Sequence, residues 1–374
     1  MKPMRPAEAE HGVVWRQTPT TCFKYNGWPS VTRDENGVLY AAASSMRLTH
    51  VDPVGKNCMW VSRDEGKTWT PPIVVNDSYF DDRDTGITYA GNGRLVMTWF
   101  TSFYRDYCQS LIDAEWFGDR DKSITRGFAE CWRHISDEEK REYTGTFVKI
   151  SEDYGVTWSE NIRVPLTAPH GCSVCSDGRL IYMGKEHTGD FRKPSPIALY
   201  ESRDGGYHWD RVGTIPEGAD TTYRDMHEPH VVELQSGRLL GAIRVHGRSS
   251  APENSVYLTH SDDGGKTWTV PECLGVDGMP PHLLVNSSGA IICSYGCRNP
   301  DAPDGRSESA VVSYDGGETW TEDYFLAPCE GPQFDLGYPA SVELSDGSIL
   351  TVYYQALPGE WHTSVLYTKW KLNR

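Results

Sequence analysis

Five copies of the pattern S-x-D-x-G-x-x-W recur along this chain of 374 residues. The copies begin at Ser62, Ser151, Ser202, Ser261 and Ser313, so their spacings are 89, 51, 59 and 52 residues. Self-similarity at a period of roughly 50–60 residues is typical of repeat architectures, in which each unit packs only against its neighbours. We therefore expect one domain over residues 1–374, rather than two unrelated cores.

A second repeat shows what one unit contains. Six polar turns with a central glycine lead into apolar runs, for example "QSGRLL" from Gln235 and "SDGSIL" from Ser345. Each turn follows a short β-rich run such as "PHVVEL", so each predicts a β-hairpin. Five hairpins continue into a third strand, the S-x-D-x-G-x-x-W turn and a fourth strand. Six units of four antiparallel strands predict an all-β, six-bladed β-propeller.

The sixth unit ends in "TSVLYTKWKL" and lacks the S-x-D-x-G-x-x-W turn. We expect its fourth strand to come from the N-terminal segment "HGVVWRQT". Pairing the two ends of the chain would close the ring and remove its last open sheet edges.

The repeated turn is expected to be structural. Its Ser and Asp can bond to backbone amides, its Gly permits a positive φ, and its Trp can fold back onto the sheet. We predict that these tryptophans pack inside their blades, away from the channel. They are Trp69, Trp158, Trp209, Trp268 and Trp320.

The second unit is longer than the others because of an insertion at about residues 101–143. Its sequence "SLIDAEWFGDRDKSITRGFAECWRHISDEEKREY" breaks the strand-like alternation and predicts one or two helices. Its aromatic and charged residues suit either a cap over one face of the propeller or a contact in a homo-oligomer, and both alternatives stay open.

Composition restricts the partners and the compartment. A net charge of −16 argues against nucleic-acid and anionic-membrane partners, and no run of 18 apolar residues is present to cross a membrane. The N-terminus lacks the apolar stretch of a signal peptide. The ten cysteines are scattered, which is typical of reduced thiols. A cytoplasmic location is therefore expected.

The starts of the six inner strands predict where a ligand binds. In a propeller these strands converge on a central channel, and their starts surround one mouth, where a binding site can form. The six starts are "NGWPS", "DDRDTG", "APHGC", "MHEPHV", "MPPHL" and "LGYPA". They are rich in His, Asp, Glu, Arg and Tyr, so we place the candidate site there.

These motifs resemble those of the sialidase (neuraminidase) superfamily over nearly the whole chain. The S-x-D-x-G-x-x-W strings are similar to its Asp-boxes. "EPHVVELQSGRLLGAIR" resembles the stretch in which a Glu precedes an Arg by 16 residues, here Glu228 and Arg244. "GYPASVELSDGSILTVYY" resembles the stretch with the catalytic Tyr, here Tyr338. The resemblance implies that Glu228 polarises a Tyr338 nucleophile, and that Asp52 in "MRLTHVDPVG" is the acid/base.

The resemblance also implies three arginines that grip a sugar carboxylate, and here the chain departs from the pattern. Gly27 stands where the first Arg belongs, and Arg47 or Arg83 is expected to replace it. Arg244 matches the second Arg. For the third, Arg306 is the nearest fit and Arg298 is its rival.

Further residues of the six strand starts, and one beside Asp52, are expected to contact the substrate. They are Asp84, His50, His170, His227, His230 and His282. Because the histidines lack a compact ligand spacing, neither a metal nor another cofactor is expected.

The sequence favours a retaining exo-glycosidase that removes a terminal, acidic sugar from a glycan. Two alternatives remain. In a uronate lyase, Arg would neutralise the carboxylate while Tyr or His abstracts the C5 proton. In a non-catalytic glycan-binding propeller, the sugar would be bound unchanged.

Overall fold

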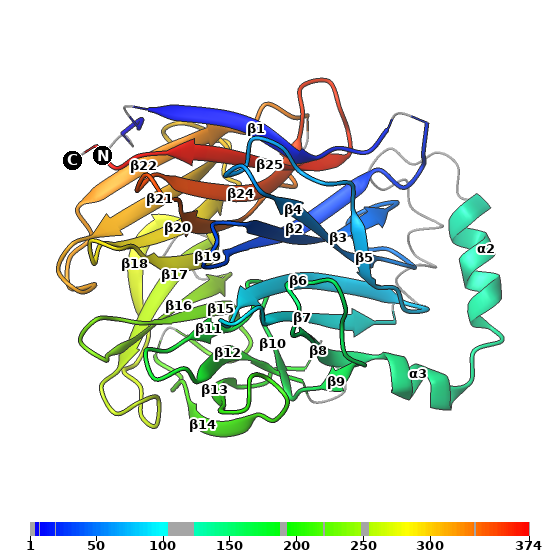
Figure 1. Ribbon diagram of the computed structural model, residues 1–374, viewed down its shortest axis with the longest axis horizontal. Helices are drawn as coiled ribbons and strands as arrows, with labels where there is room; N and C mark the ends of the chain where they lie inside the picture. Colours follow the sequence, from blue (N-terminus) through cyan, green and yellow to red (C-terminus); the bar gives the residue numbers. More distant parts are fainter. Residues whose placement is uncertain are drawn as a thin grey trace.

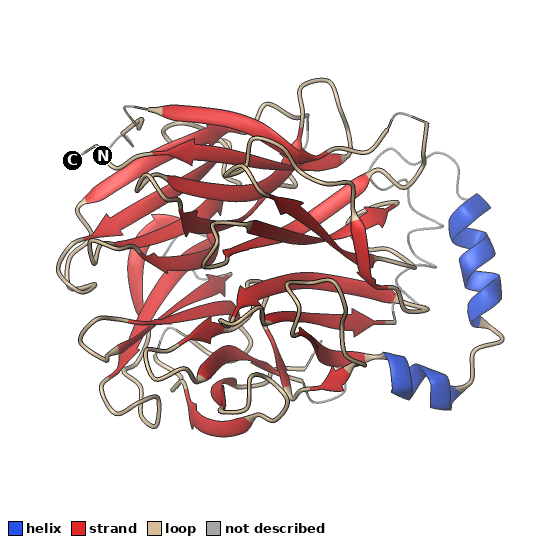
Figure 2. Ribbon diagram, in the orientation of Figure 1, coloured by secondary structure: helices blue, strands red, loops and turns tan. Residues whose placement is uncertain are grey.

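The computed structural model describes residues 4–6, 8–18, 20–103, 123–187, 193–219, 221–247, 254–332 and 334–373. These residues form six antiparallel sheets arranged as the blades of a propeller (Figures 1 and 2). In every blade the strands follow one another in sequence order from the channel outward, except that the last blade is completed by the first strand of the chain. The prediction of an all-β, six-bladed propeller is confirmed.

The first three blades comprise the following strands. Blade one contains β2 (Tyr25–Arg33), β3 (Leu39–Arg47), β4 (Lys56–Ser62) and β5 (Ile73–Asn76). Blade two contains β6 (Asp81–Tyr89), β7 (Leu95–Ser102), β8 (Gly145–Ser151) and β9 (Ile162–Arg163). Blade three contains β10 (Leu166–Thr167), β11 (Ser173–Val174), β12 (Leu180–Glu186), β13 (Ile197–Ser202) and β14 (Asp210–Thr214). Its innermost strand is thus split into two short pieces, β10 and β11, which both pair with β12.

The other three blades are each built from four strands. Blade four contains β15 (Met226–Glu233), β16 (Leu239–His246), β17 (Asn254–Ser261) and β18 (Glu272–Asp277). Blade five contains β19 (Met279–Val285), β20 (Ile291–Cys297), β21 (Ser307–Ser313) and β22 (Glu322–Pro328). Blade six contains β23 (Gly337–Glu343), β24 (Ile349–Ala356), β25 (Thr363–Trp370) and β1 (Ala9–Trp15).

The two ends of the chain close the ring, as predicted. Strand β1 pairs antiparallel with β25, so that Ala9 lies opposite Trp370 and Gly12 opposite Tyr367. Figure 1 shows the two termini side by side at one end of the molecule. This pairing supplies the outer strand of blade six and removes an exposed sheet edge.

The hydrophobic core lies between the blades. One cluster joins Leu39 and Trp60 of blade one to Leu350 and Val352 of blade six, and the other large clusters likewise span two neighbouring blades. Each blade is a single sheet, so its apolar side chains are buried only when the next sheet covers them.

The repeated turn is held by local hydrogen bonds. In the first copy the Ser62 hydroxyl donates to Asp64 over 2.9 Å and accepts from the Gly66 amide over 2.9 Å. Asp64 also accepts from the Thr68 amide, and Trp69 Nε1 donates to the Gly66 carbonyl over 3.1 Å. Two of these hydrogen bonds recur in the other four copies: from the Gly amide to the Ser hydroxyl, and from the Trp indole to the Gly carbonyl.

The tryptophans of these turns lie away from the channel, but the prediction that each packs inside its own blade needs correction. Trp158 of blade two, for example, packs on the cluster that contains Met59 of blade one and Met97 of blade two. The reason is geometric: a single sheet has no interior, so the indole fills the gap between two twisted blades.

In the described part of the chain between β7 and β8 lie the helices α2 (Ser123–Trp132) and α3 (Asp137–Tyr143). They fall in the segment where the sequence predicts an insertion, of which residues 104–122 lie outside the described residues. Trp132 anchors α2 because its ring packs against Phe103 at a centroid distance of 5.3 Å and clusters with Phe80. Within the described ranges, no helix is long and apolar enough to span a membrane.

The helices stand at the end of the propeller where the inner strands begin. Asp81, the first residue of β6, pairs with Ser102, the last residue of β7, so the chain leaves blade two at that end. Figure 2 shows both helices at one end of the molecule, opposite the chain termini in Figure 1. We refer to this end of the channel as the mouth.

Candidate active site

A repeated backbone irregularity aims side chains into the channel near the mouth. In five blades the inner strand carries a β-bulge just after its start, where two residues oppose one on the neighbouring strand. Four residues within these bulges are not glycine and yet have positive φ: Trp28 (56°), Asp84 (55°), Glu228 (46°) and Tyr338 (53°). Such conformations cost on the order of 1–3 kcal/mol each and cluster at functional sites. We call these four residues the ring.

Tyr338, Glu228 and Arg244 form a continuous hydrogen-bonded chain. The Tyr338 hydroxyl donates to Glu228 Oε1 over 2.5 Å, and Arg244 Nη1 donates to Glu228 Oε2 over 2.6 Å. Tyr338 belongs to blade six and the other two residues to blade four. Propeller closure thus brings together the two residues that the sequence predicts as candidate nucleophile and base.

The electrostatics keep the phenol neutral and the carboxylate charged. Burial raises the pKa of Glu228, but Arg244 and the hydrogen bonds from Tyr338 and Arg244 outweigh burial and lower this pKa to about 2. Burial and the negative charge of Glu228 hold the pKa of Tyr338 well above its ordinary value. Glu228 is therefore ionised, and as a carboxylate it accepts the hydrogen bond of the neutral phenol.

A close approach of two backbones supports Tyr338. Gly337 has a φ of 114°, and a Cβ added to Gly296 of the neighbouring blade would lie 2.6 Å from the Gly337 Cα. Only glycine fits at position 296, so blade five can press directly against the start of β23.

Three of the five candidate arginines, Arg244, Arg298 and Arg83, contact residues near the ring and remain partly accessible. Arg244 bonds to Glu228, as described above. The Arg298 guanidinium donates to the Leu336 carbonyl and, over 3.0 Å, to the Tyr354 hydroxyl. Tyr354 packs with Tyr338 in one aromatic cluster. Arg306 stands at the far end of the same loop, and among the described residues no bond joins it to the ring. The expectation that Arg306 is the third arginine is therefore corrected to Arg298. Arg306 lies beside Cys329 instead, at the other end of the loop.

The place of the missing first arginine is filled by aromatic side chains. A Cβ on Gly27 would lie 3.1 Å from the aromatic side chain of Tyr25. The next residue, Trp28, is one of the four ring residues. Arg83 and Arg47 both lie over the Trp28 indole, at 4.1 and 4.7 Å from its centroid.

These two arginines differ in how accessible their side chains are. Arg47 is fully buried and makes two bonds to the Asp81 carboxylate, of 2.5 and 2.9 Å. Arg83 keeps about a tenth of its side chain accessible and lies 3.8 Å from Asp81. Arg83 is thus the better candidate to replace the lost arginine, and Arg47 is structural.

Asp52 is not presented to the ring. It is 1% exposed, and its carboxylate accepts backbone N–H bonds from Leu48 (2.5 Å), Thr49 (3.1 Å) and Val54 (2.8 Å). Burial raises its pKa to about 7. These contacts make Asp52 the internal cap of the loop between β3 and β4, which corrects the expectation that it faces the substrate.

Asp335, which lies outside the quoted motifs, links the predicted residue His50 to two tyrosines of the site. His50 Nδ1 lies 3.0 Å from Asp335, and Asp335 also accepts 2.6 Å bonds from the hydroxyls of Tyr25 and Tyr354. Asp335 was not foreseen, since it is a lone acidic residue ahead of β23. Burial raises the pKa of Asp84 to about 7, with Arg83 opposing the shift.

Three of the predicted histidines form a cluster inside the channel. The rings of His230 and His282 stack at 4.4 Å, and His170 contacts His282 edge-on at 5.2 Å. His230 and His282 each accept a backbone N–H at Nδ1, from Leu283 and Ser341. All three are buried, and burial lowers their pKa values, that of His230 to about 3.

The cluster lies along a cavity of about 290 Å³ that reaches Glu233 and Val285, the residues that end β15 and β19. The three histidines therefore extend toward the end of the channel opposite the mouth. The fourth, His227, lies at the mouth, where its Nδ1 is 3.3 Å from Lys185 Nζ. In the described ranges, no group of His, Cys, Asp and Glu is arranged to hold a metal ion.

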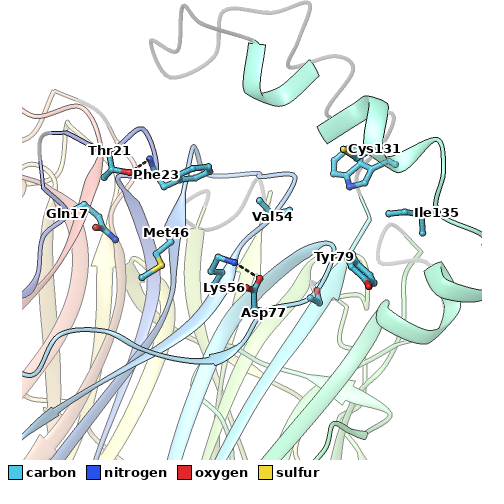
Figure 3. Close-up of a pocket in the computed structure, with 12 residues that line it drawn as sticks. Gln17, Thr21, Phe23, Met46, Val54, Lys56, Asp77, Tyr79, Cys131 and Ile135 are labelled. Carbon is cyan, nitrogen blue, oxygen red and sulfur yellow. Dashed lines mark hydrogen bonds and ion pairs between the residues drawn. The ribbon is translucent and has the colours of Figure 1, made fainter. Parts of the chain in front are cut away.

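A separate cavity of about 500 Å³ lies beside the mouth, between α2 and blades one and two (Figure 3). Its apolar lining includes Phe23, Met46, Val54, Tyr79, Trp132 and Ile135. An ion pair between Lys56 and Asp77 also lines it. None of the four ring residues lines this cavity.

Solved structures with similar folds include several sialidases. An intramolecular trans-sialidase from Ruminococcus gnavus superposes with a TM-score of 0.65 at 15% identity, over 96% of this chain and 97% of the other. A Hadza microbial sialidase gives 0.63 at 18% identity, over 93% and 66%. A protein of unknown function from Dyadobacter fermentans gives 0.75 at 20% identity, over the full length of both chains.

At the sequence level, a search of curated proteins finds no match. The family described as "BNR repeat-like domain" matches residues 128–352, which is more than half of the chain. With its six-bladed propeller and its Asp-box turns, the chain belongs to the BNR repeat-like domain family.

Proposed function

We propose that this protein is a sialidase-like exo-glycosidase that removes a terminal, acidic sugar from a glycan with retention of configuration. The observation that carries the proposal is the 2.5 Å hydrogen bond from Tyr338 to Glu228, supported by Arg244. Similar folds in proteins named sialidases agree with this assignment.

In the proposed reaction the Tyr338 oxygen attacks the anomeric carbon while Glu228 accepts the phenolic proton. The glycosidic bond breaks, and water later releases the sugar from Tyr338. A neutral phenol suits an acidic sugar, because a carboxylate nucleophile would be repelled by the sugar carboxylate. Two successive displacements at one carbon retain its configuration.

Arg244, Arg298 and Arg83 are the proposed contacts of the sugar carboxylate. Each guanidinium lies near the ring and keeps part of its surface accessible. A guanidinium binds a carboxylate through two parallel hydrogen bonds, which gives both charge and directional selectivity. Because Gly27 and Trp28 alter one side of the site, we expect selectivity different from that of an enzyme with an arginine at position 27.

The test is a screen of nitrophenyl glycosides of N-acetylneuraminic acid, glucuronic acid and neutral sugars, with NMR to follow product configuration. Tyr338→Phe should retain the fold and lose cleavage by at least ~10³-fold, because the nucleophile is gone. Tyr353→Phe is the matched control, since it removes another buried hydroxyl of blade six, one bonded to Thr368. Full activity in Tyr338→Phe would contradict the proposal. An unsaturated, ultraviolet-absorbing product from a glycan with a sugar attached at O4 of a uronate would indicate a uronate lyase instead, because β-elimination expels the O4 substituent.

A further inference from the structure

The loop between β3 and β4 presents His50, rather than Asp52, to the site. Asp52 is 1% exposed and bonded to three backbone amides, whereas 24% of the His50 side chain is accessible. The His50 ring meets the Trp28 indole edge-on at a centroid distance of 5.1 Å. Trp28 in turn contacts Tyr338 at 6.3 Å. His50 and the nucleophile thus share one aromatic neighbour.

Asp335 holds the His50 ring in one orientation. Its oxygens lie 3.0 and 3.1 Å from His50 Nδ1, and the hydroxyls of Tyr25 and Tyr354 fix the carboxylate from other sides. Burial works against ionisation, but His50, Arg298 and Tyr25 outweigh it and hold the pKa of Asp335 below its ordinary value. A carboxylate at Nδ1 keeps that nitrogen protonated, so Nε2 is the atom that gains and loses a proton.

We propose that His50 is the general acid and base of the reaction, and that Asp335 is its positioning residue. This inference rests on the proposed function and deepens it. The structure supports it because Asp52 is withdrawn from the site, while a carboxylate-oriented imidazole from the same loop stands beside the ring.

In the first step Tyr338 bonds to the anomeric carbon and its proton moves to Glu228. The glycosidic C–O bond breaks, and the leaving oxygen takes the proton from Nε2 of charged His50. In the second step water bonds to the anomeric carbon and gives a proton to neutral His50. The bond to the Tyr338 oxygen breaks, and that oxygen recovers its proton from Glu228, so the enzyme is regenerated.

The surroundings of His50 predict the pH dependence of the first step. Burial lowers the pKa of His50, Asp335 opposes this shift, and Arg83 and Arg298 add to it. The charged form needed by the leaving group is thus lost as pH rises through a value below the ordinary 6.5 of histidine. Cleavage of substrates that need the acid should decline above that pH.

A leaving-group comparison tests the proposal. A nitrophenolate leaves without a proton, whereas an alkoxide requires one. In His50→Gln, kcat/KM for methyl glycosides of N-acetylneuraminic or glucuronic acid should fall by ~10²–10⁴-fold. For the nitrophenyl glycosides of the same sugars, kcat/KM, which reports the steps through cleavage of the glycosidic bond, should change by less than ~10-fold. The ratio of the two effects does not depend on how much variant protein is folded.

Several variants separate this inference from its alternatives. Asp52→Asn should affect both substrates equally, and His208→Gln, an exposed change in a distant Asp-box turn, should affect neither. Asp335→Asn should move the basic limb of the pH profile to lower pH, because His50 loses a stabilising charge. Equal losses on both substrates in His50→Gln, a leaving-group-dependent loss in Asp52→Asn, or an unmoved pH limb in Asp335→Asn would each overturn the inference.

The proposed function can fail separately. If Tyr338→Phe is inactive on both substrates and His50→Gln shows no leaving-group dependence, only the assignment of His50 is wrong. If wild-type protein cleaves none of these glycosides, both proposals are wrong.

Discussion

The phenolic oxygen of Tyr338 lies 2.5 Å from Oε1 of Glu228, although 110 residues separate the two in the chain. Both side chains project from β-bulges in which the residue has a positive φ. The strain of two such residues is sustained only because the surrounding blades hold the bulges in place. This pair is therefore a product of ring closure, and its chemistry depends on the intact propeller.

Glu228 and Tyr338 should act as one unit. We expect Glu228→Gln to lower kcat about as much as Tyr338→Phe, because an amide accepts the phenolic proton poorly. The double variant should be little worse than either single one, as is found for residues that share one catalytic step. Steady-state kinetics on the best nitrophenyl glycoside measures this. Multiplied effects in the double variant would mean that the two residues act independently.

Arg83 and Arg47 should respond differently to substitution by Met. Arg83→Met is expected to lower kcat/KM for acidic glycosides by roughly 10–100-fold, since a charged hydrogen bond contributes about 1.5–3 kcal/mol. Neutral glycosides should be affected less. Arg47→Met should instead lower the free energy of unfolding by about 3–5 kcal/mol, because Asp81 would remain buried without its partner. Denaturant unfolding and kinetics of both variants check this. If Arg47→Met is as stable as the wild type and loses activity selectively on acidic glycosides, then Arg47, not Arg83, binds the sugar carboxylate.

The Asp-box tryptophans should matter for stability alone. Trp268 packs on the cluster shared by blades three and four and donates to the Gly265 carbonyl over 2.9 Å. Trp268→Ala should reduce the free energy of unfolding by about 3–5 kcal/mol, as expected for loss of a buried aromatic. The kcat of the remaining folded protein should stay near the wild-type value. A large fall in kcat, after correction for the folded fraction, would assign this turn to the active site.

The channel histidines should make the protein sensitive to acid. Burial, together with His230 and His170, lowers the pKa of His282 well below its ordinary value, so the folded protein leaves it neutral. Below about pH 6.5 the unfolded chain binds a proton that the folded chain does not, and stability falls by up to about 1.4 kcal/mol per pH unit for each such group.

His282→Gln removes this term while keeping a side chain that can accept the Ser341 amide. Its unfolding free energy, measured at pH 7.5 and at pH 5.0, should therefore decline less on acidification than that of the wild type. An equal decline would show that His282 is protonated in the folded protein.

Much of the fold follows from features that are local in the chain. The Ser62, Asp64, Gly66 and Trp69 contacts join residues no more than four positions apart within each bond, so the repeat alone identifies the turn. The spacing of the hairpin turns then predicts the number of blades. Resemblance to a family identified Tyr338, Glu228 and Arg244, because the residues lie at motif positions within single strands.

The rest of the candidate site depended on contacts between distant segments. Whether Asp52 or His50 faces the site is decided by how the loop after β3 folds. In that loop the Asp52 carboxylate accepts hydrogen bonds from three backbone amides. Asp335 meets Tyr25 across 310 residues, so no spacing in the sequence reveals their contact. Likewise, the sequence gives no reason to prefer Arg83 over Arg47 as the replacement for the missing first arginine. In the structure Arg47 is buried and paired with Asp81, so its side chain is not accessible to a ligand.

By itself, then, the sequence determined the repeat, the turn and the inner-strand motifs, because these rest on hydrogen bonds and alternation within a few residues. Only the tertiary structure decided which charged side chains remain accessible and which are paired in the interior. The physical reason is that burial and charged partners arise only when the blades meet, and both act over a few ångströms in space rather than along the chain.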